Sequence, residues 1–154
     1  PGSTLSALDM QGISRVAANT TLAACAGGLS SLAYIYPRNK VWDCGVTVNG
    51  FLAGLVGITA PCYWVSPFGA IAIGAIAGVV VILAVDLIEW LRIDDPVGAV
   101  AVHGFCGIWG TLSLGLFACG KYGAPGPTGP DNSTLVIGLF YVAAIASAWA
   151  KLQS

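Results

Sequence analysis

The chain has 154 residues, of which 8% are charged, and its formal net charge is −1. Soluble globular domains carry about 25% charged residues, and so little charge cannot cover the surface of a soluble domain of this length. The composition therefore predicts an integral membrane protein that contacts the lipid bilayer. It also excludes nucleic acid as a partner, because no basic patch is present to neutralise phosphates.

Uncharged stretches divide the chain into about five predicted transmembrane helices of about 19 to 25 residues, each long enough to cross a hydrocarbon core of about 30 Å. In chain order these spans lie near residues 15–36, 44–62, 67–91, 96–118 and 134–152. Two prolines and a glycine between Pro61 and Gly69 predict the turn after the second span. Glycines and prolines predict that residues 120–133 form the one long loop. The expected fold is an all-α, polytopic transmembrane helix bundle.

Basic residues predict how the bundle is oriented in the cell membrane. With five spans, four basic residues fall on one side of the bilayer and two on the other. The first group is Arg38, Lys40, Arg92 and Lys151, and the second is Arg15 and Lys121. Cytoplasmic loops carry an excess of Lys and Arg, so the first side is expected to be cytoplasmic.

Glycines recur within the predicted spans at spacings that favour close helix packing. Gly50 and Gly54 form a GxxxG pair, and so do Gly74 and Gly78. Such faces let two helix backbones approach closely inside a membrane. We therefore expect these glycines to lie at helix–helix contacts.

His103 is the only histidine of the chain, and it lies inside the fourth apolar run. Asp94, Asp95 and Pro96 precede that run and predict its start, because an aspartate caps free backbone N–H groups and proline suits the first helical position. The ring is then about 10 Å along the helix axis. Such depth makes a titratable side chain a functional candidate, although a structural histidine bonded to a neighbouring helix is the alternative.

The face around His103 indicates binding rather than catalysis. Ala99 and Gly107, four residues before and after it, are small and leave room beside the ring. A lone histidine offers no metal-ligand set, and the five cysteines form no CxxC pair, so neither a metal nor another cofactor is expected. No nucleophile or second catalytic group accompanies the ring, which argues against an enzyme.

Residues 94–96, followed by residues 102–110, resemble the penultimate transmembrane helix of the ammonium transporter family. Residues 49–60 resemble an earlier span of that family, and residues 69–74 match the span between them. The resemblance implies that residues 1–154 are a partial ammonium transporter domain. They would be helices seven to eleven of an eleven-helix fold that assembles as a homotrimer.

The resemblance also implies a function, namely transport of ammonium or ammonia through an apolar pore. His103 matches the second of the two histidines that share a hydrogen bond in the family's pore, and the first would lie on a helix upstream of this chain. Ala99 and Gly107 would line the pore beside it. Two other functions stay open: a membrane receptor of the same fold that senses ammonium, and a structural membrane subunit in which His103 only ties helices together.

Overall fold

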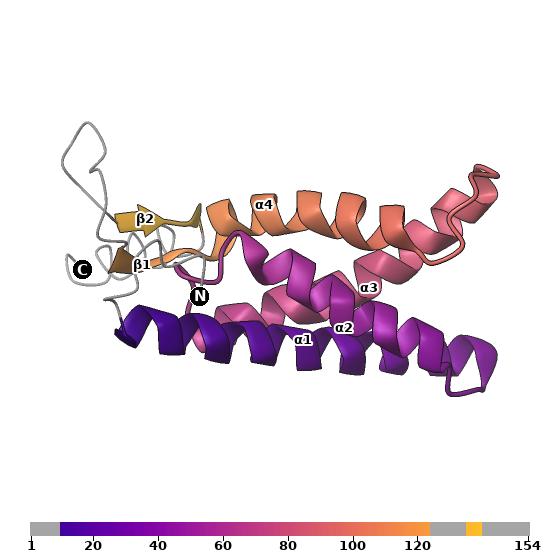
Figure 1. Ribbon diagram of the computed structural model, residues 1–154, viewed down its shortest axis with the longest axis horizontal. Coiled ribbons are helices and arrows are strands. Elements are labelled where there is room, and N and C mark those ends of the chain that lie inside the picture. The colour runs from indigo at the N-terminus through magenta and orange to yellow at the C-terminus, as the bar shows by residue number, and fades with distance from the viewer. Residues whose placement is uncertain (1–9, 124–134, 140–154) are drawn as a thin grey trace, which may run out of the picture.

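The computed structural model of the chain describes residues 10–123 and 135–139 (Figure 1). Helices make up most of this part. In chain order the elements are α1 (Met10–Asn39), α2 (Cys44–Thr59), α3 (Pro67–Trp90), the π-helix η2 (Val100–Phe105), α4 (Cys106–Phe117), β1 (Cys119–Gly123) and β2 (Leu135–Ile137). The helices run side by side along one long axis, and η2 continues directly into α4.

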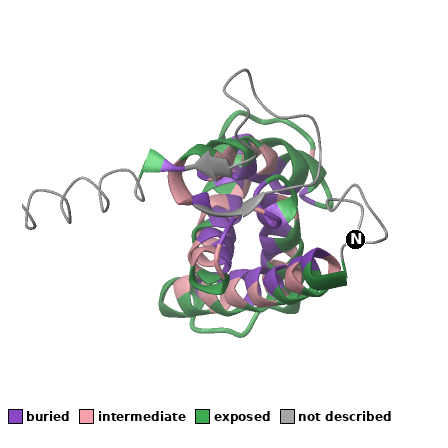
Figure 2. Ribbon diagram, turned by 90° about the vertical axis from the view of Figure 1, so that its left-hand side faces the viewer, coloured by how far each residue is buried: buried purple, intermediate pink, exposed green. Residues whose placement is uncertain are grey.

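The helices pack around two clusters of buried apolar side chains. One cluster lies toward the end where α3 stops and includes Val81, Ile82 and Ile88. The other lies toward the opposite end and includes Ile58 and Ile73. Seen along the bundle, buried residues face inward and exposed residues face outward (Figure 2). The all-α bundle expected from the sequence is confirmed.

Glycines bring α2 and α3 into backbone contact with α1. A Cβ atom added at Gly54 or at Gly74 would collide with the carbonyl oxygen of Ala23, and one added at Gly78 would collide with that of Gly27. Because no side chain larger than hydrogen fits at these three positions, the helix axes can lie close together. The GxxxG pairs thus form helix–helix contacts, as their spacing predicts.

Three of the described helices are long and apolar enough to cross a membrane: Met10–Asn39, Pro67–Trp90 and the continuous stretch Val100–Phe117. The second predicted span is shorter than residues 44–62, because α2 ends at Thr59. Pro61 follows there, and it has no N–H group to continue the helix. At 16 residues, α2 is about 24 Å long.

Two short strands lie at one end of the bundle, where the sequence predicted no strands. β1 pairs antiparallel with β2, so that Cys119 faces Ile137 and Gly123 faces Leu135. Residues 120–123 are therefore not part of an irregular loop, and residues 135–137 do not begin a helix. Each strand offers partners to the N–H and C=O groups that face it on the other strand, which favours the extended form of both segments. Residues 124–133 of the predicted loop, and residues 134 and 140–152 of the predicted fifth span, lie outside the described residues.

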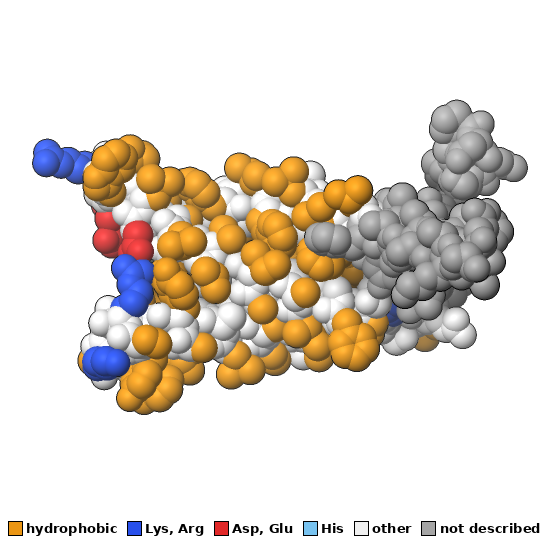
Figure 3. Space-filling view, turned by 180° about the vertical axis from the view of Figure 1, so that it is seen from behind, with side chains coloured by type: hydrophobic (Ala, Val, Ile, Leu, Met, Phe, Trp, Pro, Cys, Tyr) orange, Lys and Arg blue, Asp and Glu red, His pale blue; other side chains and the backbone are white. Residues whose placement is uncertain are grey.

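Charged side chains gather at the opposite end of the bundle (Figure 3). Arg38, in the last turn of α1, makes an ion pair of 2.8 Å with Asp86 of α3. Lys40, which follows α1, and Arg92, two residues after α3, have left-handed φ angles of 57° and 58°. These three basic residues share the side that the sequence predicts to be cytoplasmic, whereas Lys151 lies outside the described residues.

Candidate pore-lining site around His103

Asp95 caps the helix that carries His103. Its carboxylate accepts hydrogen bonds from three successive backbone N–H groups, those of Ala99, Val100 and Ala101, at 2.8, 3.0 and 3.3 Å. The first N–H groups of a helix have no partner within the helix, and a negative charge is favoured beside them. One carboxylate therefore accepts hydrogen bonds from most of the unpaired N–H groups at the start of this helix.

The helix begins later than residue 96, where the sequence predicted it. Pro96 is not its first residue but lies in a turn, which the Gly98 N–H closes by donating to the Asp95 carbonyl at 3.0 Å. Gly98 has a φ of +70°, which no helical residue adopts, so the helix can start only after it. Asp94 is exposed and makes no capping bond in the part of the chain that the structure describes.

The first turn of this helix is a π-helix, η2 (Val100–Phe105), which the sequence did not reveal. A π-helix has i→i+5 hydrogen bonds and occurs mostly as single turns, often at functional sites. His103 lies within this turn, and its carbonyl accepts the backbone N–H of Cys106. The ring is only about 5 Å from the start of the helix, because the helix begins at Val100 rather than at Pro96.

The predicted pore-lining residues lie largely on the uncovered side of η2 and α4. Ala99, His103 and Gly104 are exposed, whereas Gly107 is half-buried and turned toward Val56 of α2. Only 28% of the residues in Val100–Phe117 are buried, against 39% and 44% in an apolar 18-residue stretch of Met10–Asn39 and of Pro67–Trp90. The structure thus brings Ala99 and His103 to one open face and leaves Gly107 at its edge.

The other side of α4 is fixed to the bundle. The indole N–H of Trp109 donates to the carbonyl of Ile73 at 3.1 Å. The Cys106 thiol donates to the carbonyl of Ala77 at 3.7 Å. A Cβ atom at Gly110 would lie 2.6 Å from the carbonyl oxygen of Gly57, so α4 and α2 are in backbone contact there.

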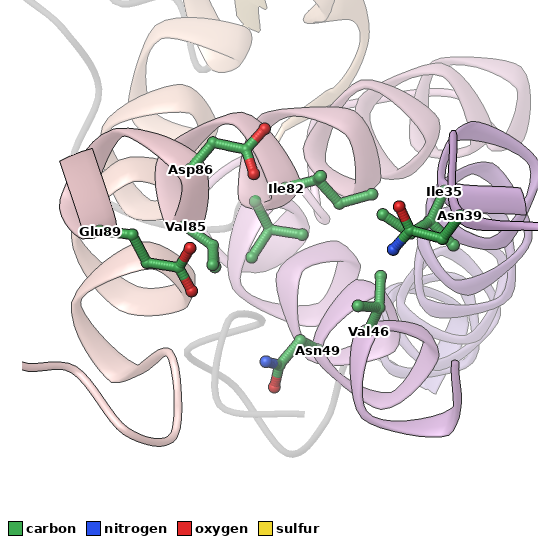
Figure 4. A pocket seen from close by; sticks show the side chains of 9 residues that line it. Ile35, Asn39, Val46, Asn49, Ile82, Val85, Asp86 and Glu89 are labelled. Carbon is green, nitrogen blue, oxygen red and sulfur yellow. The ribbon is translucent and has the colours of Figure 1, made fainter. Parts of the chain in front are cut away.

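A cavity of about 250 Å³ lies at the charged end, between α1, α2 and α3 (Figure 4). Its lining combines apolar side chains with the polar groups of Asn39, Asn49, Asp86 and Glu89. His103 is not among the lining residues, so this cavity is separate from the candidate site. Among the described residues, no three His, Cys, Asp or Glu side chains are close enough together to hold a metal ion.

A bundle of apolar helices, in which one helix exposes a histidine among small residues, defines a multi-pass membrane protein with a candidate pore wall. The Ammonium Transporter Family model matches residues 1–152. The chain therefore belongs to the ammonium transporter family, whose members are integral membrane proteins.

Individual relatives agree with this assignment. The chain is 47% identical over 140 residues to ammonium transporter Amt2 of Archaeoglobus fulgidus. This alignment covers 91% of the chain and 29% of Amt2. It superposes on the crystal structure of Saccharomyces cerevisiae Mep2 with a TM-score of 0.78 at 32% identity, over 97% of the chain and 36% of Mep2. For a sensor Amt protein the TM-score is 0.70 at 46% identity, over 72% of the chain and 28% of that protein. The chain thus spans less than a third of Amt2.

Proposed function

We propose that this chain forms one wall of a pore that conducts ammonium or ammonia across the cell membrane, with His103 on the pore surface. The observation that carries the proposal is the open face of η2 and α4. It presents His103 beside Ala99 and Gly104, while the opposite side of α4 is packed against α2 and α3. Membership in the ammonium transporter family supplies the substrate class.

The chemistry of this face suits a neutral substrate better than a bare cation. Apart from His103 and Thr111, the exposed side chains of η2 and α4 are apolar, including Val100, Ile108 and Leu112. Moving an unpaired charge into such surroundings costs far more than moving a neutral polar molecule. Ammonium can give up a proton and cross as ammonia, whereas potassium cannot. A neutral imidazole offers one donor and one acceptor to such a molecule.

A homotrimer with one pore in each subunit is part of the same proposal. Exposed apolar side chains on the outer faces of α2 and α3, such as Phe51, Leu55 and Leu83, suit contact with lipid or with neighbouring subunits. The chain spans less than a third of Amt2, so the rest of the pore wall would come from segments that correspond to the remainder of such relatives.

A chimera tests whether this chain supports transport. The segment of A. fulgidus Amt2 that aligns with this chain would be replaced by it, and the purified chimera would be reconstituted in liposomes. We expect ammonium to enter these liposomes well above the rate of empty liposomes, with potassium excluded. A chimera that assembles in the membrane and yet carries no ammonium would contradict the proposal.

A sensing role is the second candidate, and the likeness to a sensor Amt protein favours it. A receptor binds ammonium without carrying it across the bilayer. The same liposomes distinguish the two functions, because a sensor would show saturable ammonium binding to the chimera and no flux.

A further inference from the structure

Two side chains of α4 bond to backbone carbonyls of α3. Trp109 donates to Ile73 at 3.1 Å, and Cys106 donates to Ala77 at 3.7 Å. Ile73 and Ala77 are four residues apart and therefore share one face of α3, one turn above the other. Contacts at two levels resist both sliding of α4 along α3 and rotation of α4 about its own axis.

The Trp109 ring is enclosed where these helices meet. It packs against buried side chains of both apolar clusters, and it lies edge-to-face with Phe117 at a centroid distance of 6.5 Å. A Cβ atom at Gly57 of α2 would lie 3.5 Å from the ring, which is ordinary contact. The ring therefore contacts α2 and α3 together, and its N–H group selects one carbonyl of α3.

The imidazole ring of His103 is exposed and makes no hydrogen bond to another described residue. The His103 carbonyl accepts the N–H of Cys106, which follows the π-turn immediately. The direction in which the His103 side chain leaves the helix is thus set by the rotation of α4.

We propose that Trp109 is a positioning residue for His103. Its indole bond to Ile73, supported by the Cys106 thiol on Ala77, fixes the rotation of α4 so that the imidazole faces away from α1, α2 and α3. The importance of this role for transport rests on the proposed function, whereas the positioning itself can be measured without transport.

The single histidine of the chain makes that measurement direct. The full 154-residue chain, labelled with ¹³C and ¹⁵N in histidine only, gives one imidazole signal in NMR spectra of micelles or bilayers. We expect Trp109→Phe, which keeps a ring but removes the donor, to move this signal by more than its line width or to split it. Trp90→Phe is the matched control, because Trp90 is 77% exposed at the end of α3 and should leave the signal in place.

Two further variants keep the result decisive. Gly54→Ala is expected to lower the thermal midpoint through the contact of α2 with Ala23, yet to leave the His103 signal unmoved, which separates positioning from general instability. If Trp109→Phe fails to fold, Cys106→Ala removes the other bond and should move the signal in its place. An unmoved His103 signal in the folded variant would overturn the positioning role, whatever the transport experiments show.

Discussion

Among the described glycines, Gly98 is the one with a left-handed backbone conformation. Its φ of +70° is a left-handed conformation that side chains with a Cβ adopt at a cost of about 1–2 kcal/mol. A Cβ atom at this position would also lie 2.9 Å from the Asn49 amide nitrogen. The turn that precedes the His103 helix is therefore specified by one glycine.

Replacing Gly98 by alanine should destabilise the protein by at least about 1 kcal/mol, because the new residue would be strained and crowded at once. The measurement is the free energy of unfolding in detergent micelles. Gly115→Ala provides the comparison, since nothing lies within 4 Å of its added Cβ. In that helical position alanine should be neutral or stabilising by up to about 1 kcal/mol. Equal effects of the two substitutions would refute the strain at Gly98.

At the scale of an element, the start of η2 depends on one carboxylate. Asp95→Ala leaves three N–H groups without their acceptor, and it should cost about 1–2 kcal/mol of stability. Asp95→Asn keeps an oxygen acceptor and should recover part of that loss. Asp94→Ala is the control, with an expected change within about 0.5 kcal/mol, because Asp94 is exposed and makes no capping bond to a described residue. The measurement is the free energy of unfolding of the three variants, and a loss for Asp94→Ala as large as that for Asp95→Ala would contradict the capping role of Asp95.

The sequence predicted this element in part. The two aspartates before a proline predicted a helix start at residue 96, whereas in the structure Asp95 caps a helix that begins after Gly98 and Asp94 bonds to none of its N–H groups. The apolar run predicted a span. The exact first residue was missed, because Pro96 also suits a turn and the glycine two residues later was not weighed as a turn signal. The π-turn was not predictable, since a single π-turn of six residues at the start of an α-helix is too short to leave a periodicity of its own in the sequence.

At the scale of the whole molecule, α1, α2 and α3 are held together by glycine contacts. Gly54→Ala would place a methyl group against the Ala23 backbone, which cannot move aside as a flexible side chain can. We expect a loss of about 1–3 kcal/mol, as for other overpacked cores, seen as a lower thermal midpoint. Gly107→Ala should change the midpoint little, because its Cβ would meet Val56 only at 4.0 Å. The account of the packing would be wrong if Gly107→Ala were the more damaging of the two.

Composition and periodicity sufficed for the class of the molecule, because an 8% charge content leaves few alternatives to a membrane bundle. They did not predict that Trp109 bonds to α3, because a tryptophan in an apolar span can also face the lipid. Only the position of α3 in the structure places the Ile73 carbonyl within hydrogen-bonding distance of its indole N–H. Nor did they predict the pairing of β1 with β2, which joins segments separated by a stretch rich in glycine and proline. Such long-range contacts are properties of the fold rather than of local sequence.

The pore role of His103 is the central claim, and ammonium uptake by the Amt2 chimera with His103→Ala tests it most directly. The unsubstituted chimera is the reference. Ser14→Ala, on the exposed face of α1, controls for effects of expression, purification and reconstitution on the measured uptake. We predict that His103→Ala abolishes or sharply reduces ammonium uptake, or admits potassium, while the control behaves as the reference does. Unchanged uptake together with unchanged exclusion of potassium would contradict the account.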